Sequence, residues 1–406
     1  MVELGGSDLL VKVGNRPLVR VDGVLDSLPG DAGDPLEPWE TEALLHELLP
    51  QVKIKEFEDT HEVDFAYSVP ELARFRVSAY MQRGSVSIAF RVIPYSVKSI
   101  RELGLPDVVR RMADEERGVI LVTGTTSSGK STTLAAMIEH INLTTRKHVV
   151  TIEDPIEYLH RDKRAAIDQR EVGADTGSFQ SALRRVLRQD PDVILIGEMR
   201  DEETVRTALA AAETGHLVLS TLHTLNAAES VNRIIDFFAP REHEHVRAML
   251  AGTLKGIISQ RLVPKGDGTG RVPVCEILTS SARIHDAILD PDTSADLSDI
   301  IADGAYYGMQ TFDQALYEAV TSGDVDMEEA LRWADHPHDF KLLVAAQGNR
   351  STTMDAVAEP APGPPSHHPH ATFESHNHQR SQDVAPPGWA NAAVGSAITE
   401  SGANHG

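Results

Sequence analysis

The chain has 406 residues, more than a single hydrophobic core usually contains, so we expect two folded domains with additional segments. Its net charge of −23 repels nucleic acid, which excludes nucleic acid as an expected main partner. One cysteine, Cys275, excludes internal disulfides and a thiolate zinc cluster, and we expect it at the end of a strand.

The first residues, MVELGGSDLL, lack the basic and apolar regions of a secretory signal. The apolar runs in the sequence are far shorter than a membrane span. We therefore expect a cytoplasmic protein.

Residues 1–97 are predicted to form a small α+β domain. Apolar and polar residues alternate over 74–77 and 86–92, which indicates half-buried strands. The segment from Pro94 to Pro106 is bounded by two prolines and reads as a linker, because each proline disfavours helix in the residue before it.

Residues 98–264 are predicted to form an α/β domain with a mainly parallel sheet. Four short apolar runs, GVILVT, HVVTI, DVILIG and HLVLST, alternate with helical patterns over 131–142, 178–188, 202–213 and 227–238.

After residue 264 the pattern changes. Residues 265–344 predict a helical subdomain, with short helices at 282–289, 311–322 and 327–333. Residues 345–406 are rich in Pro, Ser and His and hold few core formers, so we expect a disordered tail.

The strongest motif is a complete GxxxxGK[ST] sequence between an apolar run and a helical pattern. Backbone N–H groups of such a loop surround phosphate oxygens, the lysine contacts the β and γ phosphates, and the serine binds Mg²⁺. We expect ATP and Mg²⁺ as ligands. The predicted nucleotide-binding residues are Gly124, Thr125, Thr126, Ser127, Ser128, Gly129, Lys130, Ser131 and Thr132.

Carboxylates follow two of the predicted strands. HVVTIEDPIEY ends in Glu153 and Asp154, and the proline after them turns the chain so that Glu157 can lie beside the phosphate loop. DVILIGEMRD delivers Glu198 at the strand end, where open α/β sheets bind ligands. Phosphoryl transfer to water needs one acid for the Mg²⁺ shell and one for the water.

Two histidines, His216 and His223, flank the run LVLSTL. An imidazole near the γ phosphate can donate a hydrogen bond to it and so distinguish ATP from ADP. The spacing alone does not decide between this role and a structural one.

Several segments together resemble the pilus-retraction ATPases of the PilT type, within the type II/IV secretion ATPase superfamily. They are TIEDPIEY, QREVG, ALRRVLRQDPDVILIGEMRD, ALAAAETGHLVLSTLHT and GMQTFD. The resemblance implies a PAS-like N-terminal domain on a RecA-like P-loop ATPase domain, and assembly as a homohexamer.

The resemblance also implies residue roles. Glu157 becomes the general base for water, Glu198 acts through Mg²⁺ with Ser131 as the other metal ligand, and His223 belongs to a histidine motif with His216. Arg76 and Arg91, on strands of the N-terminal domain, are expected to reach the nucleotide phosphates.

The implied function is ATP hydrolysis that drives type IV pilus retraction and twitching motility, at the inner face of the cell membrane. The expected partners are an inner-membrane pilus platform protein and other pilus ATPases. One departure weakens the retraction assignment: ARIHDAILD stands at 282–290, where retraction motors carry a helix like AIRNLIRE. An extension or secretion motor, or a nucleotide-gated scaffold with little turnover, are the alternatives.

Overall fold

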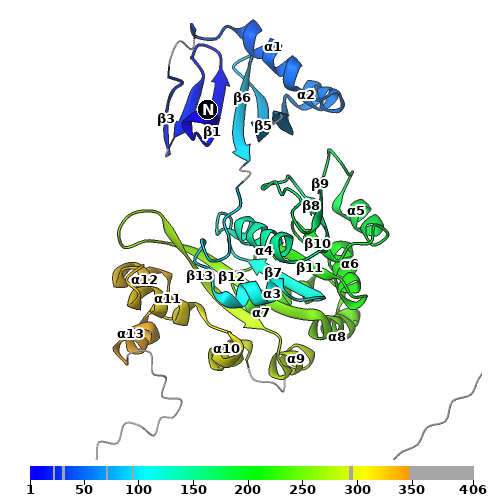
Figure 1. The fold of residues 1–406 in the computed structure, drawn as a ribbon, viewed down its shortest axis with the longest axis vertical. Helices are drawn as coiled ribbons and strands as arrows, with labels where there is room; N and C mark the ends of the chain where they lie inside the picture. The colour runs from blue at the N-terminus through cyan, green and yellow to red at the C-terminus, as the bar shows by residue number, and fades with distance from the viewer. Residues whose placement is uncertain (22, 30–32, 70–71, 94–95, 292–295, 347–406) are drawn as a thin grey trace, which may run out of the picture. The chain divides into compact units, whose positions relative to one another are not determined.

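The computed structural model describes residues 1–346 except 22, 30–32, 70–71, 94–95 and 292–295 (Figure 1). This part of the chain contains a six-stranded sheet, followed in sequence by a seven-stranded sheet. Nearly all of the predicted tail, from residue 347 onward, lies outside the described residues. Among the described helices, none is both long and apolar enough to cross a membrane.

The six-stranded sheet is antiparallel, with strand order β3-β2-β1-β6-β5-β4. Its apolar face packs against the first helix, whose Leu45 is buried together with Phe65, Phe75 and Phe90 of the sheet. The elements are β1 (Asp8–Lys12), β2 (Leu18–Val21), β3 (Val24–Ser27), α1 (Pro38–Leu48), α2 (Ile54–Thr60), β4 (Glu62–Val69), β5 (Ala73–Gln82) and β6 (Ser85–Ile93).

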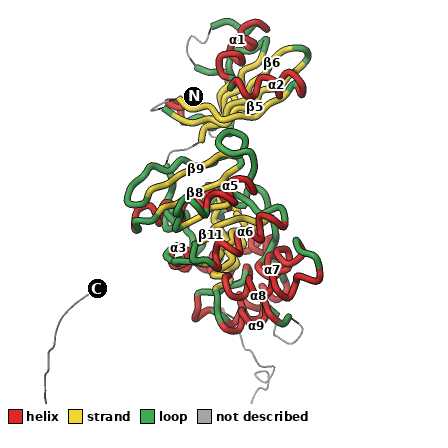
Figure 2. The backbone as a smooth tube through the Cα atoms, turned by 90° about the vertical axis from the view of Figure 1, so that its right-hand side faces the viewer, coloured by secondary structure: helices red, strands yellow, loops and turns green. Residues whose placement is uncertain are grey.

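The seven-stranded sheet has the order β13-β12-β7-β11-β10-β8-β9 and is parallel except for the β12–β13 pair. Strands β8 and β9 lie side by side at one end of it (Figure 2). The strands are β7 (Gly118–Thr123), β8 (His148–Glu153), β9 (Ala166–Glu171), β10 (Val193–Ile196), β11 (Leu217–Leu222), β12 (Leu254–Pro264) and β13 (Arg271–Thr279).

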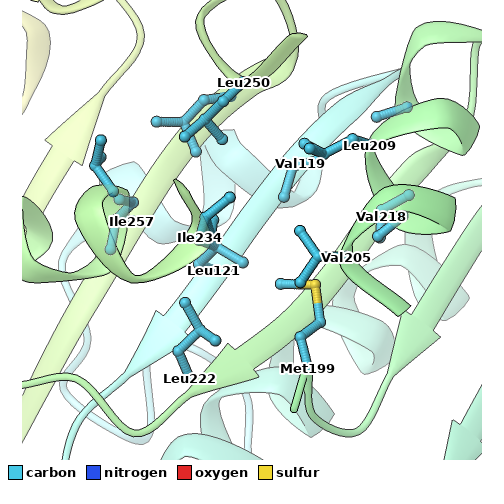
Figure 3. Packing of buried hydrophobic residues seen from close by; sticks show 14 of the residues in the cluster. Val119, Leu121, Met199, Val205, Leu209, Val218, Leu222, Ile234, Leu250 and Ile257 are labelled. Carbon is cyan, nitrogen blue, oxygen red and sulfur yellow. The ribbon is translucent and has the colours of Figure 1, made fainter. Parts of the chain in front are cut away.

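Helices cover both faces of this sheet, which explains why its central strands are apolar throughout. Val119 and Leu121 of β7 point into a cluster with α6, α7 and α8 (Figure 3). Ile120 and Val122, the alternate residues, join a cluster with α3 and α4. The helices are α3 (Asp107–Ala113), α4 (Lys130–Thr144), α5 (Phe179–Val186), α6 (Glu202–Glu213), α7 (Ala227–Asp236) and α8 (His243–Thr253).

Five further α-helices follow β13 in the described part of the chain. Three of them, α11 to α13, form their own buried cluster around Phe312, Leu316 and Phe340, against Val263 and Val274 of the last two strands. The five are α9 (Ala282–Leu289), α10 (Leu297–Asp303), α11 (Phe312–Thr321), α12 (Met327–Trp333) and α13 (Pro337–Ala345). The predicted helices at 282–289 and 327–333 have these bounds.

The region after residue 264 differs from the sequence-based expectation in one respect. Strand β13 runs antiparallel to β12 before the helices begin. Cys275 therefore lies in the middle of a strand and not at its end; it is fully buried, and burial raises the pKa of its thiol to about 12. The position is typical of a small apolar core residue.

Candidate functional site

The loop 124–129 joins the buried strand β7 to helix α4, and two glycines permit its path. Gly124 and Gly129 have φ values of 138° and 93°, which L-residues with side chains rarely adopt. A Cβ atom at Gly124 would lie 2.5 Å from the carbonyl oxygen of Gln260, and one at Gly129 would lie 2.7 Å from Nε2 of the same residue. The loop is thus packed directly on β12.

Lys130 begins helix α4 and is buried at the base of the loop. Its Nζ donates to the carbonyl oxygens of Gly124 and Thr125, at 2.9 Å each. Burial lowers its pKa, while the charges of Glu157 and Glu198 act in the opposite direction. The side-chain oxygen of Ser128 is buried and has no hydrogen-bond partner among the described residues. A buried cation and an unpaired hydroxyl in one loop suit a phosphate group.

A cavity of about 260 Å³ opens beside this loop. Seven residues predicted for the site line it: Thr126, Ser127, Lys130, Ser131, Glu157, Glu198 and His223. They come together because β7, β8, β10 and β11 are parallel neighbours, so their carboxyl ends meet at one edge of the sheet. His216 lies at the other end of β11, where its Nδ1 is 2.9 Å from the carbonyl oxygen of Ala211.

The two candidate acids differ in their surroundings. Glu198 follows β10 and is largely buried; its carboxylate lies 2.6 Å from a guanidinium nitrogen of Arg200 and 3.6 Å from Nε2 of His223. Glu157 is exposed in the cavity wall. Glu153, at the end of β8, accepts hydrogen bonds from Thr151 and Gln169, and burial raises its pKa.

Arg76 and Arg91 occupy neighbouring strands of the six-stranded sheet. Arg76 lies 3.9 Å from Asp64, and Nε of Arg91 lies 2.9 Å from a carboxylate oxygen of Asp8. Neither lines the 260 Å³ cavity. Their assignment to the nucleotide stays a prediction, as do the roles of the other predicted site residues.

Sequence reasoning missed several residues of the cavity. Arg200, Tyr158 and Phe179 line it, and Gln169 contacts its acidic loop. Arg200 carries a signal, since it stands two residues after Glu198 in GEMRD. Gln169 lies on the polar edge strand β9. Its contacts to Tyr158 and His160 depend on the pairing of β9 with β8, so the sequence alone gives no signal for them.

The cavity contains the donor types that Mg²⁺ prefers. Ser131 supplies a hydroxyl oxygen, and Glu198 supplies carboxylate oxygens on the adjoining wall. The residues present therefore fit a magnesium ion bound together with a triphosphate.

A doubly covered, mainly parallel sheet with a glycine-rich phosphate loop and acids at its strand ends defines a P-loop nucleotide-hydrolysing protein. Residues 61–332 match the family model of the type II/IV secretion system proteins. The chain belongs to this family and is an ATPase of its superfamily. Within it, the chain is similar to particular pilus proteins.

The chain is 45% identical to the type IV pilus retraction ATPase PilT of Pseudomonas aeruginosa, over 83% of this chain and 96% of that protein. It is 42% identical to the type IV pilus ATPase PilU of the same organism, over 85% of this chain and 89% of that protein. A crystal structure of the pilus retraction motor PilT with bound ADP superposes with a TM-score of 0.77 at 43% identity, covering 84% of this chain and 96% of that chain. The predicted α/β fold class is confirmed.

Proposed function

We propose that this chain is a Mg²⁺-dependent ATPase that, as a homohexamer, powers retraction of a type IV pilus. The observation that carries the proposal is the single cavity in which Lys130, Ser131, Glu157, Glu198 and His223 meet. The similarity to PilT over most of both chains supports pilus retraction as the work performed.

The residues divide the chemistry. Lys130 exchanges its bonds to the loop carbonyls for phosphate oxygens, because a desolvated ammonium gains more from an anion than from neutral acceptors. Glu157 is the base that orients and deprotonates water, and its carboxylate is free to do so at the cavity wall. Ser131 and Glu198 hold Mg²⁺, which neutralises phosphate charge when bound. His223 donates a hydrogen bond to the terminal phosphate.

Assembly is part of the proposal. Arg76 and Arg91 then leave Asp64 and Asp8 and contact the nucleotide phosphates when the ring closes, because a guanidinium stabilises transition-state charge. We propose the domain bounds 1–97, 98–264 and 265–344, with 345–406 as a tail. The motor acts at the inner face of the cell membrane on a pilus platform protein, with other pilus ATPases as further partners and no nucleic acid.

The enzymatic proposal is tested by steady-state ATP hydrolysis of the purified full chain. Glu157→Gln should lower kcat by about 100-fold or more with little change in nucleotide affinity, because it removes only the base. Lys130→Ala should weaken nucleotide binding as well. EDTA should abolish turnover, and added Mg²⁺ should restore it.

Turnover that persists in both variants would remove the assigned site. The direction of work is tested by deleting the gene: hyperpiliated, non-motile cells indicate retraction, and cells without pili indicate extension. Wild-type protein that binds ATP but does not hydrolyse it would leave only the nucleotide-gated scaffold.

A further inference from the structure

The loop 154–160 carries Glu157, and the side chain of Glu157 does not anchor it. Within the described part of the chain, no hydrogen bond or ion pair holds the Glu157 carboxylate, and the residue is exposed. The position of this carboxylate relative to the phosphate loop therefore follows the path of the loop backbone. Whatever fixes that backbone fixes the distance from Glu157 to the reacting water.

Two side chains of β9 hold the loop from one side. The amide Nε2 of Gln169 donates to the carbonyl oxygen of Tyr158 at 2.8 Å, and its Oε1 accepts the backbone N–H of His160 at 2.8 Å. Glu171, two residues further along the same strand, accepts the backbone N–H of Ile156 at 3.2 Å and is buried. Residues two apart on a strand share a face, so β9 presents both side chains to the loop.

Helix α4 holds the loop from the other side. The phenolic oxygen of Tyr158 lies 2.8 Å from the hydroxyl oxygen of Thr132, with either group able to donate. Thr132 is two residues after Lys130, in the first turn of the helix that carries the phosphate contacts. The residue next to Glu157 is thus bonded through its carbonyl to the sheet and through its side chain to the phosphate-binding helix.

We propose that Gln169 and Tyr158 are positioning residues that together fix the carboxylate of Glu157 beside the phosphate loop. The side-chain amide of Gln169 bonds both the N–H of His160 and the carbonyl oxygen of Tyr158, so it holds the loop backbone in one conformation. Tyr158 ties that path to α4, so Glu157 and Lys130 keep a fixed separation. The proposal rests on Glu157 as the base of the proposed ATPase.

Two substitutions test this without removing the apolar packing. Tyr158→Phe deletes only the hydroxyl group, and Gln169→Leu replaces the amide with a side chain of similar size. We expect kcat to fall about 5- to 10-fold in Tyr158→Phe and more than about tenfold in Gln169→Leu, because loss of orientation acts on the chemical step. The Kd for ATP should stay within about twofold of wild type in both. Tyr306→Phe, at an exposed tyrosine outside the cavity, is the control and should leave both values unchanged.

A double-mutant cycle separates positioning from a general structural effect. In a Glu157→Gln background, Tyr158→Phe and Gln169→Leu should cause no further loss of the single-turnover rate, because their action passes through Glu157. A full additional loss in that background, or a weakened Kd with unchanged kcat, would overturn the proposal. A Glu157→Gln enzyme with normal turnover refutes the proposed function itself, whereas an inactive Glu157→Gln beside fully active Tyr158→Phe and Gln169→Leu refutes only this inference.

Discussion

At the scale of single residues, Glu276 is a buried carboxylic acid on the edge strand β13. Its Oε1 accepts the backbone N–H of Ala227, the first residue of α7, at 2.7 Å. Burial raises its pKa to about 7, helped by the negative charge of Asp335 and opposed by the Ala227 hydrogen bond and Arg261. The side chain therefore joins β13 to the start of α7, and its contribution to the free energy of unfolding depends on pH.

The sign of that dependence follows from the raised pKa. The folded chain binds this proton more tightly than the unfolded chain, so the contribution of Glu276 to stability is complete below its ordinary pKa of 4.5 and is lost as the pH rises through about 7. Glu276→Gln keeps the acceptor for Ala227 and removes the titration. We expect the free energy of unfolding of the variant, relative to that of wild type, to increase by up to about 3 kcal/mol from acidic to alkaline pH.

Urea-denaturation midpoints at about pH 5 and about pH 8 measure this difference. Glu244→Gln, at an exposed position of α8, is the matched control and should change little at either pH. A stability difference between Glu276→Gln and wild type that is the same at both pH values would contradict the prediction.

Most of the predicted cavity residues could be found from the sequence because each lies in the segment that follows an apolar run. Parallel strands bring their carboxyl ends together, so Lys130, Glu157, Glu198 and His223 meet without any further information. Gln169 could not be found in this way. Its hydrogen bonds to the backbone of Tyr158 and His160 form only because β9 pairs with β8 beside that loop. A single polar residue on an edge strand gives no sequence pattern that would predict such contacts.

At the scale of elements, Arg261 of β12 holds the C-terminal helices to the sheet. Its guanidinium lies 3.7 Å from the ring centre of Phe312, donates to the carbonyl oxygen of Trp333 at 2.8 Å, and pairs with Asp335 at 2.7 Å. One planar cation thus contacts α11 and the end of α12 together. A lysine has the charge but neither the stacking surface nor the paired donors.

We expect Arg261→Lys to loosen α11, α12 and α13 by about 1–3 kcal/mol while the sheet remains folded. Hydrogen exchange of the amides in these helices should become roughly tenfold faster or more, with little change in β7 and β11. Arg332→Lys is the control, because Arg332 has an exposed side chain and pairs with Glu328 and Glu329 of its own helix. Equal acceleration in both variants would show that Arg261 has no special role.

The elements themselves were predictable to different degrees. Strands β7, β8, β10 and β11 are buried on both faces and therefore appear as continuous apolar runs. A strand ending near Cys275 was expected, but the full extent of β13 and its pairing with β12 were not, because Pro273 and Glu276 interrupt its pattern and the pairing is set by a tertiary contact. Strand β9 has the sequence AIDQRE, which is mostly polar and therefore looks like a loop when only the sequence is considered.

At the scale of the whole molecule, the cavity residues and the C-terminal helical cluster occupy different stretches of the chain. The residues that line the 260 Å³ cavity all lie between positions 126 and 223. Phe340 of α13, in contrast, is 1% exposed and packs in the cluster with Phe312 and Leu316. The last described helix should therefore matter for folding, and the residues after it should not matter for hydrolysis.

We expect a chain truncated after residue 346 to hydrolyse ATP within roughly twofold of the full-length rate, because it keeps every cavity residue and the core. A chain truncated after Ala334 lacks α13 and should melt at a lower temperature, since Phe340 no longer fills its site. Circular dichroism melting and ATPase assays on both proteins check the two statements. A truncation after residue 346 that abolishes turnover would give the tail a direct part in the reaction.

The placement of His216 and His223 at opposite ends of β11 limits what they can sense. Seven residue steps along an extended strand span roughly 20 Å, which exceeds the length of a triphosphate. The two imidazoles of one chain therefore cannot report on the same terminal phosphate. If both histidines respond to nucleotide, His216 must respond either to a nucleotide bound by another copy of the chain or to a shift transmitted along β11. Each nucleotide site would then respond to the state of its neighbours as well as to its own.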